Sequence, residues 1–445
     1  MPPKKIAHFS PGRIILLSVL AAICIGTILL LLPISRRENI SIIDIFFTAT
    51  SVTCVTGLLT VPLSSFTPFG QVVIMCLMQI GGLGLITMTI FILSVFVQLG
   101  LTTQLLAGQM LELESWKNIR SLLLFIIQFT FALELLGAIG IFFSIWHDFP
   151  LEYGFFYSFF HAISSFCDAG FTLFPNGLIP YNRNILLLTI TAILMFSGGL
   201  GFITWHEIMD YIKAMIFKKR RFFSLYTKIV LSTSFSLIFS TSVLYWILER
   251  NNAFHAMNPF IAFCNTVFNA IASRSTGFIT VHPTELQVAT LFVVMIIAFI
   301  GSSPGSTGSG IKTTTFAIFL ATVHAAISGR TTVQIKGRRI ARDQVYKALA
   351  VISLSLAWII LTIFCLLITE RSWEFFDIVF EVISAFATLG LSTGITPYLS
   401  VIGKLFIMTT MIIGRIGSLT IILALRKKRA EKQEYQYPEE RVMLG

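Results

Sequence analysis

The chain alternates long apolar stretches with short polar connections, and the apolar stretches come in two lengths. A run of about 20 apolar residues crosses the hydrocarbon core of a bilayer as a helix. Eight runs are long enough, although the sixth is interrupted: 14–33, 69–98, 121–146, 184–212, 226–248, 286–328, 348–369 and 399–425. Taken in order, the eight runs form four pairs, and one shorter apolar run lies between the two members of each pair. These shorter runs are 42–53, 155–166, 258–273 and 374–387. The pattern predicts four units, each a span, a re-entrant half-helix and a second span.

Two sets of glycines keep step with these runs. The first set ends a short segment after each half-helix, at intervals of 113, 107 and 113 residues: Gly57, Gly170, Gly277 and Gly390. The second set follows 24, 28, 24 and 24 residues later: Gly81, Gly198, Gly301 and Gly414. We therefore predict an all-α integral membrane protein in which eight transmembrane helices and four re-entrant half-helices form four pseudo-symmetric repeats around one central pore. The repeats are placed at 1–98, 99–212, 213–328 (with a broken second helix) and 329–445 (with a cytosolic tail).

Composition agrees with a membrane protein. Of 445 residues, 55% are hydrophobic and 12% are charged, against roughly 45–50% and 25% in soluble domains. The net charge is +11, and 23 of the 32 Lys and Arg residues lie in the N-terminus, the tail and the alternate connections between units. Basic residues gather on the cytosolic side of membrane proteins. We expect a multi-pass protein of the cell membrane, surrounded by lipid, with both termini cytosolic and no nucleic-acid partner.

Other classes of site find little support. The six cysteines form no CxxC pair, and the seven histidines lack the spacing of a helical metal site. The sequence therefore indicates neither a disulfide framework nor a zinc site. No nucleophile and base are paired along the chain, so an enzyme is not expected. A scaffold would not need four re-entrant segments.

The four glycine segments are the candidate ion site. Non-helical backbone is tolerated at membrane depth only where it is buried in protein or lines a watery cavity. Rings of carbonyl oxygens can then replace the water around a cation such as K⁺, and glycine allows the required positive φ. Helix packing alone would explain one such glycine, but not four in register. The candidate filter residues, binding K⁺ through the backbone only, are Val55, Thr56, Gly57, Asp168, Ala169, Gly170, Ser275, Thr276, Gly277, Thr388, Leu389 and Gly390.

A polar loop interrupts the sixth apolar run. Ten residues of Gly, Ser, Thr and Pro cannot hold an ordinary helix at that depth and need a polar cavity. A loop with four glycines rearranges easily, which suits a gate. It also approaches a phosphate-binding motif, but Ile311 intervenes before the lysine and the flanks are apolar helix. The candidate gate residues are Gly301, Ser302, Ser303, Pro304, Gly305, Ser306, Thr307, Gly308, Ser309, Gly310, Lys312 and Arg415.

Charged residues within apolar runs have two open interpretations each. Arg415 is either a positive barrier or loop partner in the pore, or one half of a salt bridge between helices. Asp168 either tunes the cation site, or Asp168 and Arg274 satisfy each other or nearby backbone. Lys312 either acts like Arg415 or extends to the cytosol. Glu134 has no motif behind it.

In its four glycine segments and its polar loop, the chain resembles the Trk/Ktr/HKT superfamily of cation transporters, and within it the bacterial KtrB-type membrane subunit. The resemblance extends over essentially the full length of the chain. The resemblance implies one glycine per unit at the K⁺ site, an intramembrane loop that obstructs the pore below it, and a pore-facing basic residue at Arg415. The second glycine of the Thr-Val-Gly-Tyr-Gly channel motif is replaced here, so only part of the filter is expected to be well formed: Leu59, Thr172, Ile279 and Ser392.

The resemblance also implies how the protein works. It is expected to be the ion-translocating subunit of a K⁺ uptake system, a gated pore that forms a homodimer on a separate cytosolic ring of KtrA-type nucleotide-binding subunits. Na⁺ would modulate flux, and nucleotide would act only through the partner. The basic connections 210–228 and 329–347 are candidate docking surfaces. The alternative is an alternating-access secondary cation symporter, a class usually built from two halves.

Overall fold

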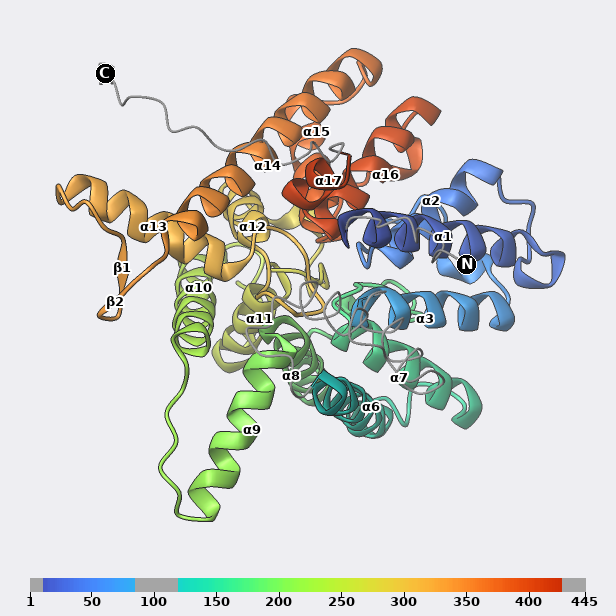
Figure 1. Ribbon diagram of the computed structural model, residues 1–445. Helices are drawn as coiled ribbons and strands as arrows, with labels where there is room; N and C mark the ends of the chain where they lie inside the picture. Colours follow the sequence, from blue (N-terminus) through green and yellow to red (C-terminus); the bar gives the residue numbers. More distant parts are fainter. Residues whose placement is uncertain (1–10, 85–118, 426–445) are drawn as a thin grey trace, which may run out of the picture.

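The computed structural model describes residues 11–84 and 119–425 (Figure 1). The repeat boundary predicted at residues 98 and 99 lies outside the described residues, as do Lys4, Lys5 and the tail beyond residue 425. The part of the predicted 69–98 span beyond Gly84 also lies outside them.

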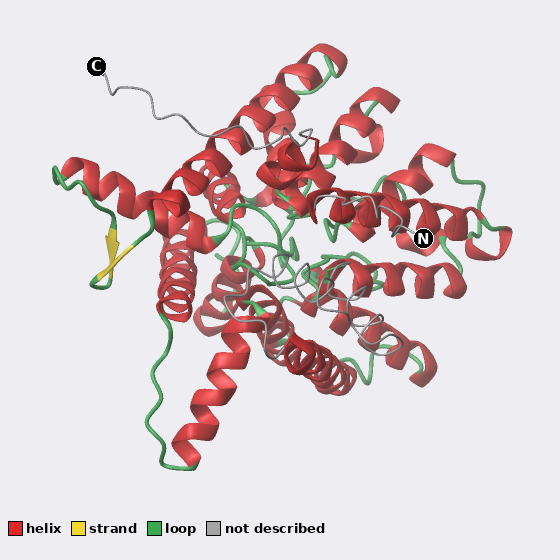
Figure 2. Ribbon diagram, viewed as in Figure 1, coloured by secondary structure: helices red, strands yellow, loops and turns green. Residues whose placement is uncertain are grey.

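The described residues are helical apart from loops and one small hairpin (Figure 2). Four long helices alternate with four short ones along the chain. The long helices are α1 (Pro11–Leu31), α6 (Ile119–Ser144), α10 (Leu225–Glu249) and α14 (Arg342–Thr369). The short helices are α2 (Ile42–Thr53), α7 (Leu151–Phe166), α11 (Pro259–Ala272) and α15 (Phe375–Ala387). These bounds lie within a few residues of the four short apolar runs.

Each short helix is followed by a loop, a single 3₁₀ turn and another helix. The turns are η2 (Leu63–Ser65), η3 (Ile179–Tyr181), η4 (Pro283–Glu285) and η5 (Thr396–Tyr398), and η1 (Pro33–Ser35) precedes α2. The helices that follow are α3 (Pro68–Leu83), α8 (Ile185–Leu200), α12 (Val288–Ile300) and α16 (Val401–Ile416). The remaining elements are α9 (Phe202–Ile216), α13 (Thr313–Ile327), α17 (Ser418–Leu425), β1 (Gln334–Ile335) and β2 (Arg338–Arg339).

Among the described residues, four helices are long and apolar enough to cross a membrane: Gly12–Leu31, Ser121–Ser144, Leu225–Glu249 and Arg342–Thr369. Two of the second apolar runs differ from the prediction of a continuous span, whereas the break in 286–328 was predicted. The predicted 184–212 span is bent by 102° between α8 and α9, and the predicted 399–425 span is interrupted between α16 and α17. The breaks fall at Gly201 and Gly417, both with φ of 92°, a conformation that side chains other than glycine rarely adopt.

Three glycines of the second set allow a close helix contact. A Cβ atom at each would overlap the last or neighbouring backbone carbonyl of a short helix: Gly81 against Thr53, Gly198 against Phe166 and Gly414 against Phe386. The short helix ends are therefore held directly against the backbone of α3, α8 and α16. Gly301, the fourth member, instead begins the polar loop after α12, with a φ of 43°.

Buried acids join the ends of two helix pairs. The Glu249 carboxylate, at the end of α10, accepts a 3.0 Å bond from the backbone of Gln287 and another from the hydroxyl of Thr290, in the first turn of α12. Glu370, just after α14, likewise accepts from the backbone and hydroxyl of Ser400, before α16. The acids satisfy N–H groups that a helix start leaves unpaired.

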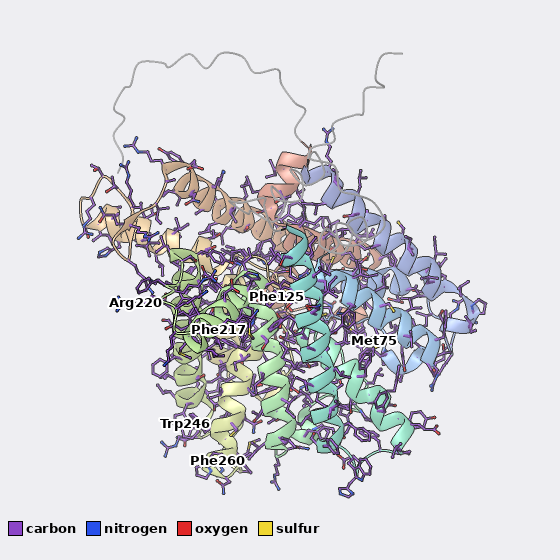
Figure 3. The ribbon with its side chains drawn as sticks, turned by 60° about the horizontal axis from the view of Figure 1, so that its bottom comes forward. Met75, Phe125, Phe217, Arg220, Trp246 and Phe260 are labelled. Carbon is purple, nitrogen blue, oxygen red and sulfur yellow. The ribbon has the colours of Figure 1, made fainter. Side chains whose placement is uncertain are left out.

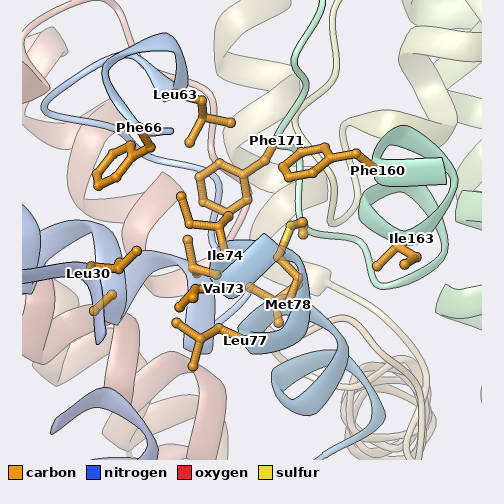
Figure 4. Packing of buried hydrophobic residues seen from close by; sticks show 14 of the residues in the cluster. Leu30, Leu63, Phe66, Val73, Ile74, Leu77, Met78, Phe160, Ile163 and Phe171 are labelled. Atoms are coloured by element: carbon orange, nitrogen blue, oxygen red, sulfur yellow. The ribbon is translucent and has the colours of Figure 1, made fainter. Parts of the chain in front are cut away.

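The apolar core is divided among the contacts between neighbouring helix sets. One cluster joins α3 to α7 and to Phe171, which follows the second glycine segment (Figure 4). Others join α7 and α8 to α11, α1 and α2 to α14–α16, and α12 to α15. The helices α1 and α16 also contact each other, which brings the first and last sets together. The helices consequently surround a centre occupied by loops (Figure 2).

Candidate functional site

The short helices α2, α7 and α15 end in the same way. Just past each helix, a residue with positive φ donates from its backbone N–H to the carbonyl three positions earlier, and the N–H of the next residue donates to the carbonyl five positions earlier. This is the Schellman arrangement. The positive-φ residues are Val55 at 56°, Asp168 at 58° and Thr388 at 50°, each two positions before the segment's glycine. Side chains rarely adopt this conformation, and it is uncommon above all for the β-branched Val55 and Thr388.

The third segment differs. Ser275 has no positive φ, and the backbone N–H groups of Thr276 and Gly277 both donate to the carbonyl of Ala272. The four glycines nevertheless share one conformation, with φ of 96°, 73°, 67° and 85° at Gly57, Gly170, Gly277 and Gly390. The predicted need for glycine at these positions agrees with this geometry.

The four glycine segments close into a ring. Each glycine lies so near a backbone carbonyl of the next segment that a Cβ atom would crowd it: Gly57 against Ala169, Gly170 against Thr276, Gly277 against Leu389 and Gly390 against Thr56. The last pairing returns from the fourth segment to the first. Segments separated by more than 100 positions therefore meet around one centre, with the residue before each glycine presenting its carbonyl to the neighbouring glycine.

A hollow of about 300 Å³ lies beside this ring. It is lined by three of the four glycines and by the residues that follow them, including Thr172, Ile279 and Ser392. These three replace the second glycine of the channel motif. The Ser392 hydroxyl in turn donates a 2.9 Å bond to the buried carboxylate of Glu381 on α15, a residue that the sequence analysis did not single out.

The 301–310 loop packs against the second helix set. Its backbone N–H groups at Ser303 and Thr307 donate to the carbonyls of Gly199 and Gly198 at 3.1 and 3.2 Å. The carbonyl of Gly305 accepts a 2.9 Å bond from the N–H of Phe202 in return. Ser302, Ser303, Thr307 and Ser309 are buried. The end of α8 and the loop thus satisfy each other's backbone, which explains how an irregular segment is tolerated here.

Asp168 links the ring to the loop. Its carboxylate accepts a 2.9 Å bond from the hydroxyl of Thr276 and a 3.0 Å bond from that of Thr307. All three side chains are buried. Arg274 donates from Nη2 to the carbonyl of Gly301 at 3.3 Å, and no ion pair joins it to Asp168 among the described residues. The two side chains do not contact each other, but the bond from Arg274 to the Gly301 carbonyl is the contact with nearby backbone that the second interpretation named. A role of Asp168 in tuning the cation site stays a prediction.

Arg415 bridges the loop and the first helix set. Its Nη1 donates to the carbonyl of Thr307 and, at 3.2 Å, to the hydroxyl of Ser309. Its Nη2 donates to the carbonyls of Gly81 and Gly82. Within the described residues no carboxylate lies within ion-pair distance of this guanidinium. Arg415 therefore contacts both the loop and α3 through backbone carbonyls, and a role in the pore stays a prediction.

The loop has two further contacts, of which that of Tyr226 was not anticipated from the sequence, whereas Lys312 was among the candidate gate residues. The hydroxyl of Tyr226, at the start of α10, donates a 2.8 Å bond to the carbonyl of Pro304. Lys312 donates to the carbonyl of Gly308 at 2.8 Å and precedes α13 as its N-cap. Tyr226 lies within the basic connection 210–228 and carries no motif, so no sequence signal marks it.

Comparison with known proteins assigns the chain to a family. Residues 13–436 match the family TrkH, described as a cation transport protein. The chain belongs to this family. It is 35% identical to the potassium/sodium uptake protein NtpJ of Enterococcus hirae, over 98% of each chain. It is 36% identical to the Ktr system potassium uptake protein B of Bacillus subtilis, over 99% of this chain and 98% of that one.

A solved structure shares the fold. The potassium transporter TrkH from Vibrio parahaemolyticus superposes with a TM-score of 0.75 at 17% sequence identity, covering 95% of this chain and 86% of that one. The chain is therefore a multi-pass membrane protein of the TrkH fold that transports cations across the membrane, and it is not an enzyme.

Proposed function

We propose that this chain is the ion-translocating subunit of a K⁺ uptake system and works as a gated pore. Two relatives that align with nearly the whole chain carry potassium uptake in their names, and one of these names includes sodium. The ring of four glycine segments is the observation that carries the proposal, because it brings four backbone carbonyls and four positive-φ glycines to one centre.

The ring supplies the filter. A K⁺ ion enters from the hollow of about 300 Å³ and exchanges its water for backbone carbonyls. It then moves toward the C-terminal ends of α2, α7, α11 and α15. Each helix dipole places partial negative charge at such an end, which attracts the cation. The transported ion is a substrate held transiently. The replacement of the second motif glycine at Leu59, Thr172, Ile279 and Ser392 limits the number of well-formed sites, so Na⁺ competes more effectively than in a complete channel filter.

The 301–310 loop, with Lys312 and Arg415, supplies the gate. The loop is attached to the filter through Asp168 and to α3 through Arg415. Flux requires these bonds to break or rearrange, which a loop of four glycines permits at low steric cost. In this proposal the chain contains four pseudo-symmetric repeats and eight spans.

The partners follow from the resemblance to the Ktr system. Two copies of the chain form a homodimer on a cytosolic ring of KtrA-type subunits, which bind the regulatory nucleotide, while Na⁺ modulates flux. Both termini are cytosolic. Of the two basic connections, 329–347 would face the ring.

The test is uptake of ⁸⁶Rb⁺ into proteoliposomes by the purified protein, with K⁺ or Na⁺ as competitor. Gly277→Ser adds a side chain that overlaps the Leu389 carbonyl at a φ of 67°. We expect K⁺ to block uptake and this substitution to lower K⁺ affinity or selectivity about tenfold or more, as expected when a clash of about 1–3 kcal/mol is introduced. Gly329→Ser is the matched control, because its φ is 63° but nothing lies within 4 Å. Uptake indifferent to K⁺ and to Gly277→Ser would favour an alternating-access symporter.

A further inference from the structure

The helix α9 and the connection after it form an arm that leaves the helical body (Figure 1). The bend of 102° at Gly201 turns α9 nearly perpendicular to α8. The 16 residues of α8 rise about 24 Å, and the hydrocarbon core is about 30 Å thick. If α8 crosses the core, α9 therefore begins close to the opposite boundary and runs along the membrane plane.

The residues of α9 are arranged on two faces. Ile208, Tyr211, Ile212, Met215 and Ile216 recur at helical spacing along one side. Acidic, basic and histidine side chains occupy the other side: His206, Glu207, Asp210 and Lys213. Such a helix, amphipathic and lying in the plane of the bilayer, is suited to the boundary between headgroups and acyl chains.

The connection after α9 pairs with the polar side chains of the helix and leaves the C-terminal part of its apolar face open. Asp210 forms an ion pair of 3.0 Å with Arg221, and the carboxylate of Glu207 accepts a 2.9 Å bond from the hydroxyl of Ser224. In the part of the chain that the structure describes, the side chains of Met215, Ile216 and Phe217 are 63%, 68% and 73% exposed. The connection therefore contacts the acids of α9 and, through Phe223 against Tyr211 (ring centroids 4.6 Å apart), the middle of its apolar side, while the apolar end of the helix stays exposed.

A basic cluster lies at the tip of the same arm. Lys218, Lys219 and Arg220 follow α9 directly and are exposed. None of them forms an ion pair with an acid in the part of the chain that the structure describes. Phe217 and Arg220 appear at the same level of the molecule in Figure 3, away from Trp246 and Phe260 at its lower end. The side chain of Phe222, on the far side of the cluster, is 83% exposed.

We propose that this arm is a membrane-surface anchor for anionic phospholipid: Met215, Ile216, Phe217 and Phe222 enter the acyl boundary, and Lys218, Lys219 and Arg220 bind the phosphate headgroups. Charge complementarity selects this occupant, because exposed phenylalanines flanking three unpaired cations match an apolar layer beneath a negative surface. A protein partner would instead have to bury the same phenylalanines while supplying acids for all three cations. The inference concerns lipid and does not depend on which cation is transported.

The experiment uses the full-length protein with Phe217→Trp, reconstituted in mixed phosphatidylcholine and phosphatidylglycerol bilayers. One lipid at a time carries bromine in its acyl chains, which quenches a neighbouring indole. Subtracting the emission of the unsubstituted protein removes the six native tryptophans. We expect brominated phosphatidylglycerol to quench the added indole about twofold or more above brominated phosphatidylcholine at equal mole fraction, as charge attraction enriches anionic lipid.

The charge test adds Lys218→Gln, Lys219→Gln and Arg220→Gln to the Phe217→Trp protein, and the ratio of the two quenching values should fall to about one. The matched control carries Arg330→Gln, Arg338→Gln and Arg339→Gln, three exposed cations around the β1–β2 hairpin, and should keep the ratio. Quenching by neither lipid would place the arm away from the acyl chains, in water or against protein, and overturn the proposal. Equal quenching by both lipids before the charges are removed would also overturn it.

Discussion

The carboxylate of Asp168 accepts a 3.0 Å hydrogen bond from the hydroxyl of Thr307, a residue 139 positions away. The same carboxylate accepts from Thr276. Since Asp168 and Thr276 belong to adjacent glycine segments and Thr307 to the 301–310 loop, one side chain connects the ring with the loop beside it. A change at the loop is therefore expected to reach the ion site through Asp168.

We expect Asp168→Asn to raise the rate of ⁸⁶Rb⁺ uptake and to weaken the preference for K⁺ over Na⁺. Asparagine tolerates the positive φ at this position, but the substitution removes a charged acceptor whose hydrogen bonds contribute about 1.5–3 kcal/mol each, so about a tenfold change in flux is expected. Thr307→Val removes only the loop contact and should raise flux with the ion preference retained. Equal ion preference in wild type and Asp168→Asn would contradict the connection to the ring.

Shortening the loop should open the pathway. Deleting residues 304–306 removes the carbonyls that accept from Tyr226 and Phe202, while the 3.1 Å bond between the backbones of Ser302 and Ser309 at the loop base can remain. We expect faster ⁸⁶Rb⁺ uptake in proteoliposomes without any regulatory partner. A deletion variant that elutes as a single folded species and shows no gain in rate would refute the gate.

Arg415 should act through the loop and not through helix packing alone. Arg415→Ala leaves the carbonyls of Gly81 and Thr307 without this donor, and hydrogen bonds to a charged group are worth about 1.5–3 kcal/mol. We expect several-fold faster uptake. Arg415→Lys, which keeps the charge but cannot span both carbonyls, should behave similarly. A fall in melting temperature with an unchanged uptake rate per folded molecule would assign Arg415 a purely structural role.

The backbone contact between α16 and α15 should tolerate no side chain. A Cβ at Gly414 would overlap the carbonyl of Phe386, and forcing apart packed backbones costs about 1–3 kcal/mol or more. We therefore expect Gly414→Ala to lower the melting temperature in detergent by several degrees. Gly154→Ala on α7, where a Cβ would come no nearer than 3.6 Å to a neighbour, is the control and should melt near the wild type. Equal melting of both variants would show that the contact can relax.

The local features of the fold were predictable because they depend on residues near each other in the chain. Apolar runs predicted the four short helices to within a few residues, and the glycine spacing indicated where positive φ occurs. The break between α8 and α9 was missed. Gly201 lies inside a continuous apolar run, and composition alone does not distinguish a glycine that packs within a helix from one that ends it.

The sequence by itself determined the membrane class, the fourfold recurrence and the family, since each is a pattern of residue types at set intervals. The tertiary structure alone decided which residues meet: the pairing of each glycine with the carbonyl of the next segment, the Asp168 bridge from Thr276 to Thr307, and the reach of Arg415 from the loop to Gly81. The physical reason is that a hydrogen bond needs its two atoms within about 3 Å, and a distance between groups 100 or more positions apart is set by the packing of whole helices.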